Sequence, residues 1–460
     1  MPPKCGCDSR TAKMTSRMKM KMHLIGKWAY AFVVLIGIAA LSGGLPSIAA
    51  GEVKIGVIYP LTGGSAAAGR ELEIGARLAA DIANRKMPDL ALDIANHAGI
   101  QSLGGQKVRL LFRDHKGDPR LCADLAETLI TSEKVQGIIG SYQSSVTRAV
   151  SDVCERHGIP MINGTSTSPA LTQRGYQWFW RTTPHDKWFT RDLFALLVGL
   201  TEGKVQGVPH VPKKEIGTIA SACENSEWGT HVSDLIRMMA DEYGFVLGPS
   251  LLYSAKAKDF SREAGTLVKG RPGVMLFASY TADAILMMKA LRARHAAPKI
   301  IWGQDAGFER IEFRGMLGYD IEGVLTRTVF HPKLAGAKKI VGQVNALYKH
   351  KKRAGDDMGG AAARAFTAVQ TWIHILEKAG STEAADIQKA ANRISIPGDQ
   401  LIVPWYGIQF AEEGEEKGQN VLGSGLIGQY QIDTEGNLVM EIVYPFKLAT
   451  AKMIYPFKGF

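Results

Sequence analysis

The fold is decided first by residues 53–64, VKIGVIYPLTGG. Val, Ile and Tyr dominate its first seven positions and are typical of a buried β-strand, and the Pro and Gly that follow indicate a turn. A helix is predicted over 71–84, because Leu72, Ala76, Ala79 and Ala83 recur at three- and four-residue spacing. A strand, a turn and an amphipathic helix in this order are the first unit of an α/β fold.

The same alternation continues along the chain and then starts again. In the first block, strands are predicted over 108–113, 135–140 and 160–163, and helices over 121–132 and 146–157. The second block has strands over 215–222, 245–253, 274–279 and 300–302, and helices over 229–243 and 282–294. Helices over 360–380 and 382–393 follow, and then strands over 407–410, 429–433 and 438–443. We therefore expect an α/β fold of two doubly wound, parallel-sheet lobes, joined by several crossing segments.

Residues 1–50 are predicted to be a secretory signal peptide outside the fold. Basic residues such as Lys13 and Lys27 accompany an apolar run from Trp28 to Leu41, and small residues up to Ala50 follow, as in a cleaved leader. A membrane anchor is the alternative, but this run is shorter than the roughly 20 residues that span a bilayer. The remaining chain is expected in the periplasm.

The composition is that of a globular protein and argues against several function classes. With 46% hydrophobic and 22% charged residues, the chain is neither disordered nor a coiled coil. Its net charge of +11 lies partly in the leader and is otherwise spread out, which argues against nucleic-acid binding. Cys122, Cys154 and Cys223 form no CxxC pair, so no metal site is expected, while a disulfide between two of them stays open. No cofactor is expected, because no P-loop is present.

Two neighbouring strand ends are rich in hydroxyl side chains. Ligands of open α/β sheets bind beyond the carboxyl ends of the strands. Ser144 and Ser145 follow the strand over 135–140 at a helix start, and Thr165 and Thr167 follow the next strand. Each hydroxyl alone fits a helix cap. Because the two strand ends converge, together they predict a cradle for a carboxylate, which the positive end of a helix also favours.

The strand ends of the second block carry different chemistry. Trp228, Tyr280 and Asp305 each come just after a predicted strand. Taken singly, Trp228 fits a core position and Asp305 a helix cap. Together, aromatic rings and a carboxylate complement a cationic amine. We therefore expect a zwitterionic ligand, held by hydroxyls on one lobe and by an acid with rings on the other, and enclosed by hinge motion.

Several segments carry a resemblance to a known family by their order and spacing. They are 55–63, Asp114 with Asp118, 140–145, 167–172, 181–184 and 303–305. On these segments the chain resembles the type I periplasmic binding proteins of the leucine/isoleucine/valine-binding branch, over about 52 to about 444. The resemblance implies one lobe from 51–183 and 327–425 and a second from 184–326 and 426–460. It also implies a monomer that binds a small molecule and delivers it to the permease subunits of an ABC importer at the inner membrane.

The resemblance assigns roles to the same residues. It implies that Ser144, Thr165 and Thr167 hold the ligand's carboxylate, that Asp305 and Tyr280 hold its amine, and that Trp228 flanks it. Ala68 is a departure, because several relatives have an aromatic residue there. The pocket is therefore expected to be altered. Amino acids, amides and aromatic acids all remain open as ligands.

Two other function classes, an enzyme and a ligand sensor, are alternatives to solute binding. An enzyme is not expected, because no G-x-S-x-G elbow lies between a strand and a helix and the histidines are scattered. The alternative that stays open is an extracytoplasmic ligand sensor that passes its signal to a separate receptor.

Overall fold

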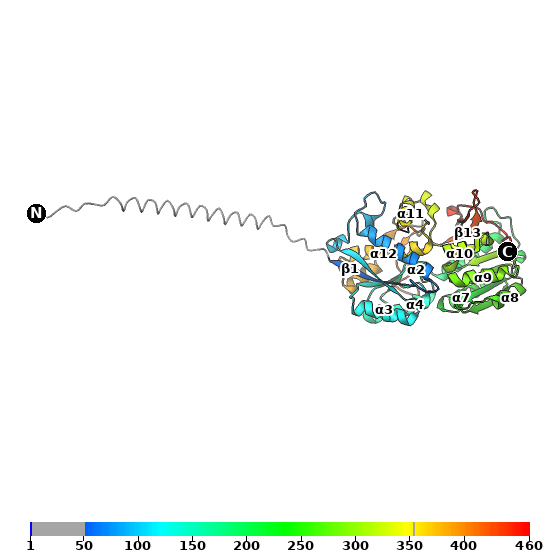
Figure 1. Ribbon diagram of the computed structural model, residues 1–460, viewed down its shortest axis with the longest axis horizontal. Coiled ribbons are helices and arrows are strands. Elements are labelled where there is room, and N and C mark those ends of the chain that lie inside the picture. Colours follow the sequence, from blue (N-terminus) through cyan, green and yellow to red (C-terminus); the bar gives the residue numbers. More distant parts are fainter. Residues whose placement is uncertain (2–50, 353–354) are drawn as a thin grey trace. The chain divides into compact units, whose positions relative to one another are not determined.

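Two β-sheets organise the part of the chain that the computed structural model describes, which is Met1, residues 51–352 and residues 355–460 (Figure 1). The signal peptide predicted over 1–50 lies outside these residues, apart from Met1. The segment Glu52–Phe460 forms one compact unit. Within the described residues, no helix is long and apolar enough to cross a membrane.

The first lobe is built on a parallel five-stranded sheet in the order β2-β1-β3-β4-β5. Its strands are β1 (Glu52–Tyr59), β2 (Lys107–Asp114), β3 (Gly137–Gly140), β4 (Met161–Asn163) and β5 (Phe179–Arg181). Its helices are α2 (Ala66–Ala83), α3 (Pro119–Thr131), α4 (Ser144–His157), α11 (Lys339–Lys352), α12 (Gly360–Ala379) and α13 (Ala384–Asn392). Val53, Ile55 and Val57 of β1 are fully buried, as expected for a strand covered on both faces.

The second lobe is built on a seven-stranded sheet in the order β14-β13-β10-β9-β8-β6-β7. Its strands are β6 (Ile219–Glu224), β7 (Leu247–Tyr253), β8 (Val274–Ala278), β9 (Ile300–Gly303), β10 (Leu325–Thr328), β13 (Leu426–Ile432) and β14 (Leu438–Tyr444). Its helices are α5 (Asp186–Thr201), α6 (Lys213–Ile216), α7 (Glu227–Glu242), α8 (Ser261–Lys269), α9 (Thr281–Arg292) and α10 (Ile311–Leu317). β13 pairs antiparallel with both β10 and β14, and the remaining strand pairs of this sheet are parallel.

Helices α2 and α12 pack so closely that only a glycine fits at one contact. A Cβ atom added to Gly75 of α2 would lie 2.1 Å from the carbonyl oxygen of Ala362 in α12. The alanine-rich start of α12 permits the same approach from the other side, and this helix is buried on nearly its whole surface. The pair fixes the positions of Glu71 on α2 and Arg364 on α12, which both belong to the site described below.

The predicted α/β fold with two lobes is confirmed, with local differences. The strand predicted over 215–222 begins instead at Ile219, because α6 precedes it and Gly217 breaks the chain direction with a φ of +77°. α5, α8, α11, β5 and β10 were not predicted. β10 ends at Thr328. The predicted lobe boundaries remain predictions.

Candidate functional site

The loops after β3 and β4 are tied together by Asn163, the last residue of β4. Its Nδ2 donates to the carbonyl oxygens of Gly140 (2.8 Å) and Ser141 (3.1 Å). Its Oδ1 accepts from the backbone N–H of Ser166 at 2.9 Å. Thr165 Oγ1 donates to the carbonyl oxygen of Ser141 at 2.5 Å. The two hydroxyl-bearing loops that the sequence analysis selected are therefore one connected structure.

Ser144, Thr165 and Thr167, which we call the hydroxyl cradle, are all buried in this structure. Ser144 Oγ accepts from the backbone N–H of Ser168 at 3.3 Å, which leaves its own proton free to be donated. Among the described residues, no side chain caps the N-terminus of α4, where Ser144 and the half-buried Ser145 lie. The positive end of this helix therefore adds to the attraction for a carboxylate.

Aromatic rings from both lobes meet beside the cradle. The ring of Tyr142, after β3, lies 5.8 Å from that of Tyr280, after β8, and Trp228 of α7 lies 5.0 Å from Tyr280. The Tyr142 hydroxyl and Trp228 Nε1 are buried and have no hydrogen-bond partner within the described ranges. Buried tyrosine and tryptophan normally pair these groups. The rings thus offer both an apolar surface and polar contacts to a bound molecule.

Asp305 lies in a strained turn directly after β9. Asp305 and Ala306 have positive φ angles of 61° and 44°, which is uncommon for residues other than glycine. The turn also packs tightly against the start of α9 in the same lobe, because a Cβ on Gly307 would lie 2.4 Å from the carbonyl oxygen of Tyr280. Such strain is kept where the surroundings fix the conformation, and it is common at functional sites.

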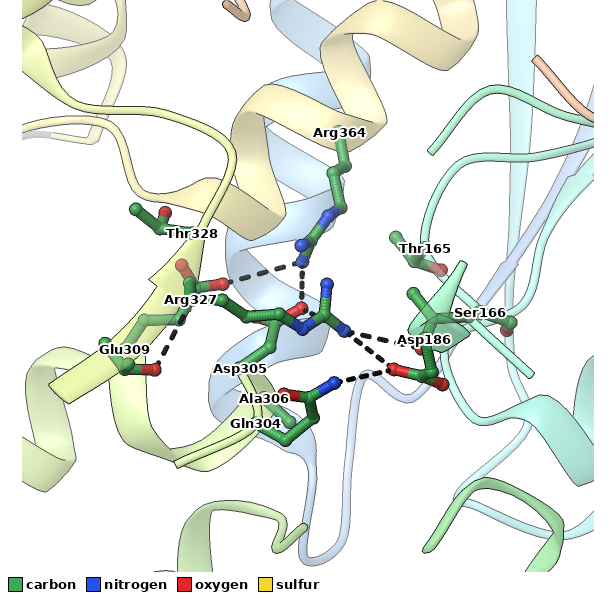
Figure 2. Close-up of polar contacts among 12 residues, drawn as sticks. Thr165, Ser166, Asp186, Gln304, Asp305, Ala306, Glu309, Arg327, Thr328 and Arg364 are labelled. Carbon is green, nitrogen blue, oxygen red and sulfur yellow. Dashed lines mark hydrogen bonds and ion pairs between the residues drawn. The ribbon is translucent and has the colours of Figure 1, made fainter. Parts of the chain in front are cut away.

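The Asp305 carboxylate is ion-paired with two arginines (Figure 2). Its Oδ2 lies 2.6 Å from Arg364 Nη1 of α12 and 3.2 Å from Arg327 Nη2 of β10. Asp305 was predicted from the sequence to hold the amine of a ligand, and that prediction did not include these arginines. Because Arg364 comes from the first lobe and Asp305 from the second, the pair also joins the lobes.

Further charged side chains extend this contact into what we call the ion cluster. Its members are Asp305, Arg327, Arg364, Glu309, Arg310, Glu71 and Asp186. Arg310 of the second lobe lies 2.7 Å from Glu71 of the first and 2.6 Å from Glu309. Asp186 lies 3.2 Å from Arg327. Charges buried at this density must be paired with one another.

Burial and ion pairing shift the pKa values of the two carboxyl groups at the centre of the cluster, Asp305 and Glu309, in opposite directions. Burial alone would raise the pKa of Asp305, but Arg364 and Arg327 outweigh it and hold this pKa well below its usual range. Burial and the neighbouring Asp305 raise the pKa of Glu309 from 4.5 to about 8. This raised pKa favours the protonated, neutral form of Glu309 at neutral pH.

The largest cavity described lies beside the ion cluster and not at the cradle. It has a volume of about 590 Å³, and Glu71, Glu309 and Arg310 are among its lining residues. It does not include the hydroxyl cradle or the aromatic residues, where the sequence analysis expected the ligand. The hydroxyl cradle and the aromatic rings remain the candidate ligand site, because binding needs matched polar groups as well as space.

Some residues of the site were selected from sequence and others were missed. Ala68 is fully buried in the first turn of α2, three residues before Glu71. The missed residues are Tyr142, Asn163, Glu309, Arg327 and Arg364. A signal existed for one of these, because Arg364 interrupts the small, apolar start of α12. Arg327 stands between two threonines of the short β10 and gave no such signal. A charge inside a buried element is rare unless it is paired.

Comparison with known proteins settles the family of this two-lobed chain. The family model described as periplasmic binding protein matches residues 52–419. The chain belongs to the periplasmic binding proteins. The predicted resemblance to their leucine/isoleucine/valine-binding branch is confirmed by a relative named Leu/Ile/Val-binding protein homolog 7, from Brucella abortus. This relative is 24% identical over 425 residues, which cover 92% of this chain and 99% of the relative.

Solved structures of this family share the fold. A leucine-binding protein from Thermotoga maritima matches with a TM-score of 0.67 and 21% identity, over 86% of this chain and all of that protein. A solute-binding protein from Rhodopseudomonas palustris, solved with 3,4-dihydroxybenzoic acid, matches with a TM-score of 0.67 and 17% identity. That match covers 84% of this chain and 95% of the other. These relatives are solute-binding proteins and not enzymes.

Proposed function

We propose that this protein captures a small, carboxylate-bearing solute between its lobes and delivers it to the permease of an ABC importer in the inner membrane. The observation that carries the proposal is the position of the hydroxyl cradle, whose buried polar groups face aromatic and charged side chains of the second lobe. A molecule bound there contacts both lobes. Only such contacts favour a closed arrangement over an open one.

The roles within the site follow from this geometry. Ser144, Ser145 and Thr167 receive a carboxylate at the start of α4, and Thr165, whose hydroxyl donates to the Ser141 carbonyl oxygen, holds the two loops together. The rings of Trp228 and Tyr280, with Tyr142, cover the apolar body of the solute, and Ala68 leaves room beside it. A monomer in the periplasm that takes up an amino acid, an amide or an aromatic acid fits these roles. Relatives solved with isoleucine and with 3,4-dihydroxybenzoic acid support the range of solutes.

A thermal-shift screen of the purified protein tests solute capture. The panel contains amino acids, amides and aromatic acids, and a bound solute raises the melting temperature by mass action. For any solute that binds, Ser144→Ala should weaken affinity by about tenfold or more, because a hydrogen bond to a charged group is lost. A panel without any shift would contradict the proposal.

Ser151→Ala is the matched control for this variant. Ser151 is buried in the same helix, where it contacts Arg148 and Arg174 and no residue of the site. The control should leave affinity unchanged. Uptake of the bound solute should also fail in cells that lack this chain. Unchanged uptake with loss of a gene response would instead support the sensor alternative.

A further inference from the structure

The ion cluster suggests which chemical class of solute the site prefers. We propose that Arg327 and Arg364 take the place of a ligand amine, so that the preferred solute is a carboxylic acid without a cationic amine. This inference rests on the proposed function and names the ligand class of the same site. It departs from the zwitterion that the sequence analysis expected.

The first step is that Asp305 already has cationic partners. Both guanidinium groups contact its Oδ2, at 2.6 Å and 3.2 Å, and both arginine side chains are buried. An ammonium group that reached Asp305 would lie close to two guanidinium charges. Like charges repel strongly where water is excluded, so the amine of an amino acid is disfavoured there.

The second step is that the arginines have donors left over. Arg327 Nε and Nη1 and Arg364 Nε and Nη2 are buried without a hydrogen-bond partner in the part of the chain that the structure describes. The two side chains are only 2% and 3% exposed. Buried N–H groups of a charged side chain need acceptors. A carboxylate supplies acceptors and a negative charge, whereas an ammonium group supplies only more donors.

The third step is that the Arg327 guanidinium lies next to the hydroxyl cradle. Arg327 Nη2 is 3.4 Å from Thr167 Oγ1, and Figure 2 shows Thr165 on the same side of the Arg327 guanidinium as Asp186. The ring of Phe189 lies 3.6 Å from the guanidinium carbon and fixes the plane of the group. One carboxylate can therefore receive hydroxyls from the first lobe and a guanidinium from the second.

Matched pairs of small molecules test this inference on the purified protein. The pairs are 3-phenylpropanoate with phenylalanine and 4-methylpentanoate with leucine, and the members of each pair differ only in the amine. Isothermal titration calorimetry should show the amine-free acid binding at least about tenfold more tightly in a pair that fits the pocket. Equal or tighter binding of the amino acid overturns the inference.

A variant links the preference to the arginines. Arg364→Gln removes one charge from Asp305, and it should shift the ratio of acid to amino-acid affinity by at least about tenfold toward the amino acid. Arg364→Lys keeps the charge and should keep the preference. Arg148→Gln is the control, because Arg148 pairs with Glu227 outside the cluster, and its ratio should equal that of the unchanged protein. An unchanged ratio in folded Arg364→Gln overturns the inference.

Failure of this inference can be told apart from failure of the proposed function. If no member of the pairs binds and the solutes of the screening panel that bind all carry a cationic amine, the ligand class is wrong and solute capture stands. If no solute of either set binds, both proposals fail. If Arg364→Gln does not fold, the matched pairs on the unchanged protein decide the question alone.

Discussion

Two ion-pair contacts join the lobes with nearly the same geometry and very different surroundings. Arg310 and Glu71, in the ion cluster, are 2.7 Å apart, and their side chains are 1% and 11% exposed. Arg148 of α4 and Glu227 of α7 are 2.8 Å apart, but the arginine is 42% exposed. Distance alone would rank the two contacts as equals. Their burial predicts instead that the first is essential to a network and that water screens the second.

Removing the buried arginine should have the largest effect. Arg310→Met leaves the Glu71 carboxylate without its cationic partner, and breaking a buried pair in this way costs about 3–5 kcal/mol. Chemical unfolding in urea measures the loss. Adding Glu71→Gln to the variant should recover part of it, because one unpaired charge is then removed. A loss below about 1 kcal/mol would show that the two contacts are alike after all.

The pH dependence of stability comes next. The folded protein keeps a proton on Glu309 that the unfolded chain releases above about 4.5, so the stabilising contribution is complete below that pH and is lost as pH rises toward about 8. In Glu309→Gln this decline should be absent. The unfolding free energy of the unchanged protein should therefore fall relative to the variant, by up to about 1.4 kcal/mol per pH unit. Parallel pH profiles from pH 5 to 8 would contradict the raised pKa.

The exposed contact should show the smallest effect. Arg148→Gln is expected to change the unfolding free energy by at most about 1 kcal/mol, because a half-exposed pair is solvated in either state. The difference should vanish in about 1 M NaCl, where the screening length is about 3 Å. The loss in Arg310→Met should persist at the same salt concentration. A salt-sensitive loss in both variants would remove the distinction between the contacts.

The fold could be predicted because its signals are local. The strand over 53–59 and the helix over 360–380 are patterns of neighbouring residues, and they appear as β1 and α12 with nearly the same ends. The missed β5 and β10 are only three and four residues long, too short for a period to show. α5 is longer, but residues 193–200 are apolar at nearly every position, so no helical period stands out there.

The site could be predicted only in part, because pairing across the fold is not a local property. The position of Asp305 after a strand was visible in the sequence. Its two arginines are 22 and 59 residues further along the chain, on a strand and a helix of different lobes. A residue type indicates what a side chain can bind. Only the packing of the folded chain decides whether that side chain is already paired with another side chain of the protein.

The close contact between α2 and α12 has a mechanical consequence. Since Gly75 lies against the backbone of Ala362, these helices cannot slide past one another without a steric clash. Glu71 of α2 and Arg364 of α12 are therefore expected to move together as parts of one rigid unit. A rotation of the second lobe must therefore form or break two contacts together, that of Arg310 with Glu71 and that of Asp305 with Arg364. Separation of the lobes at this point should be cooperative and not stepwise.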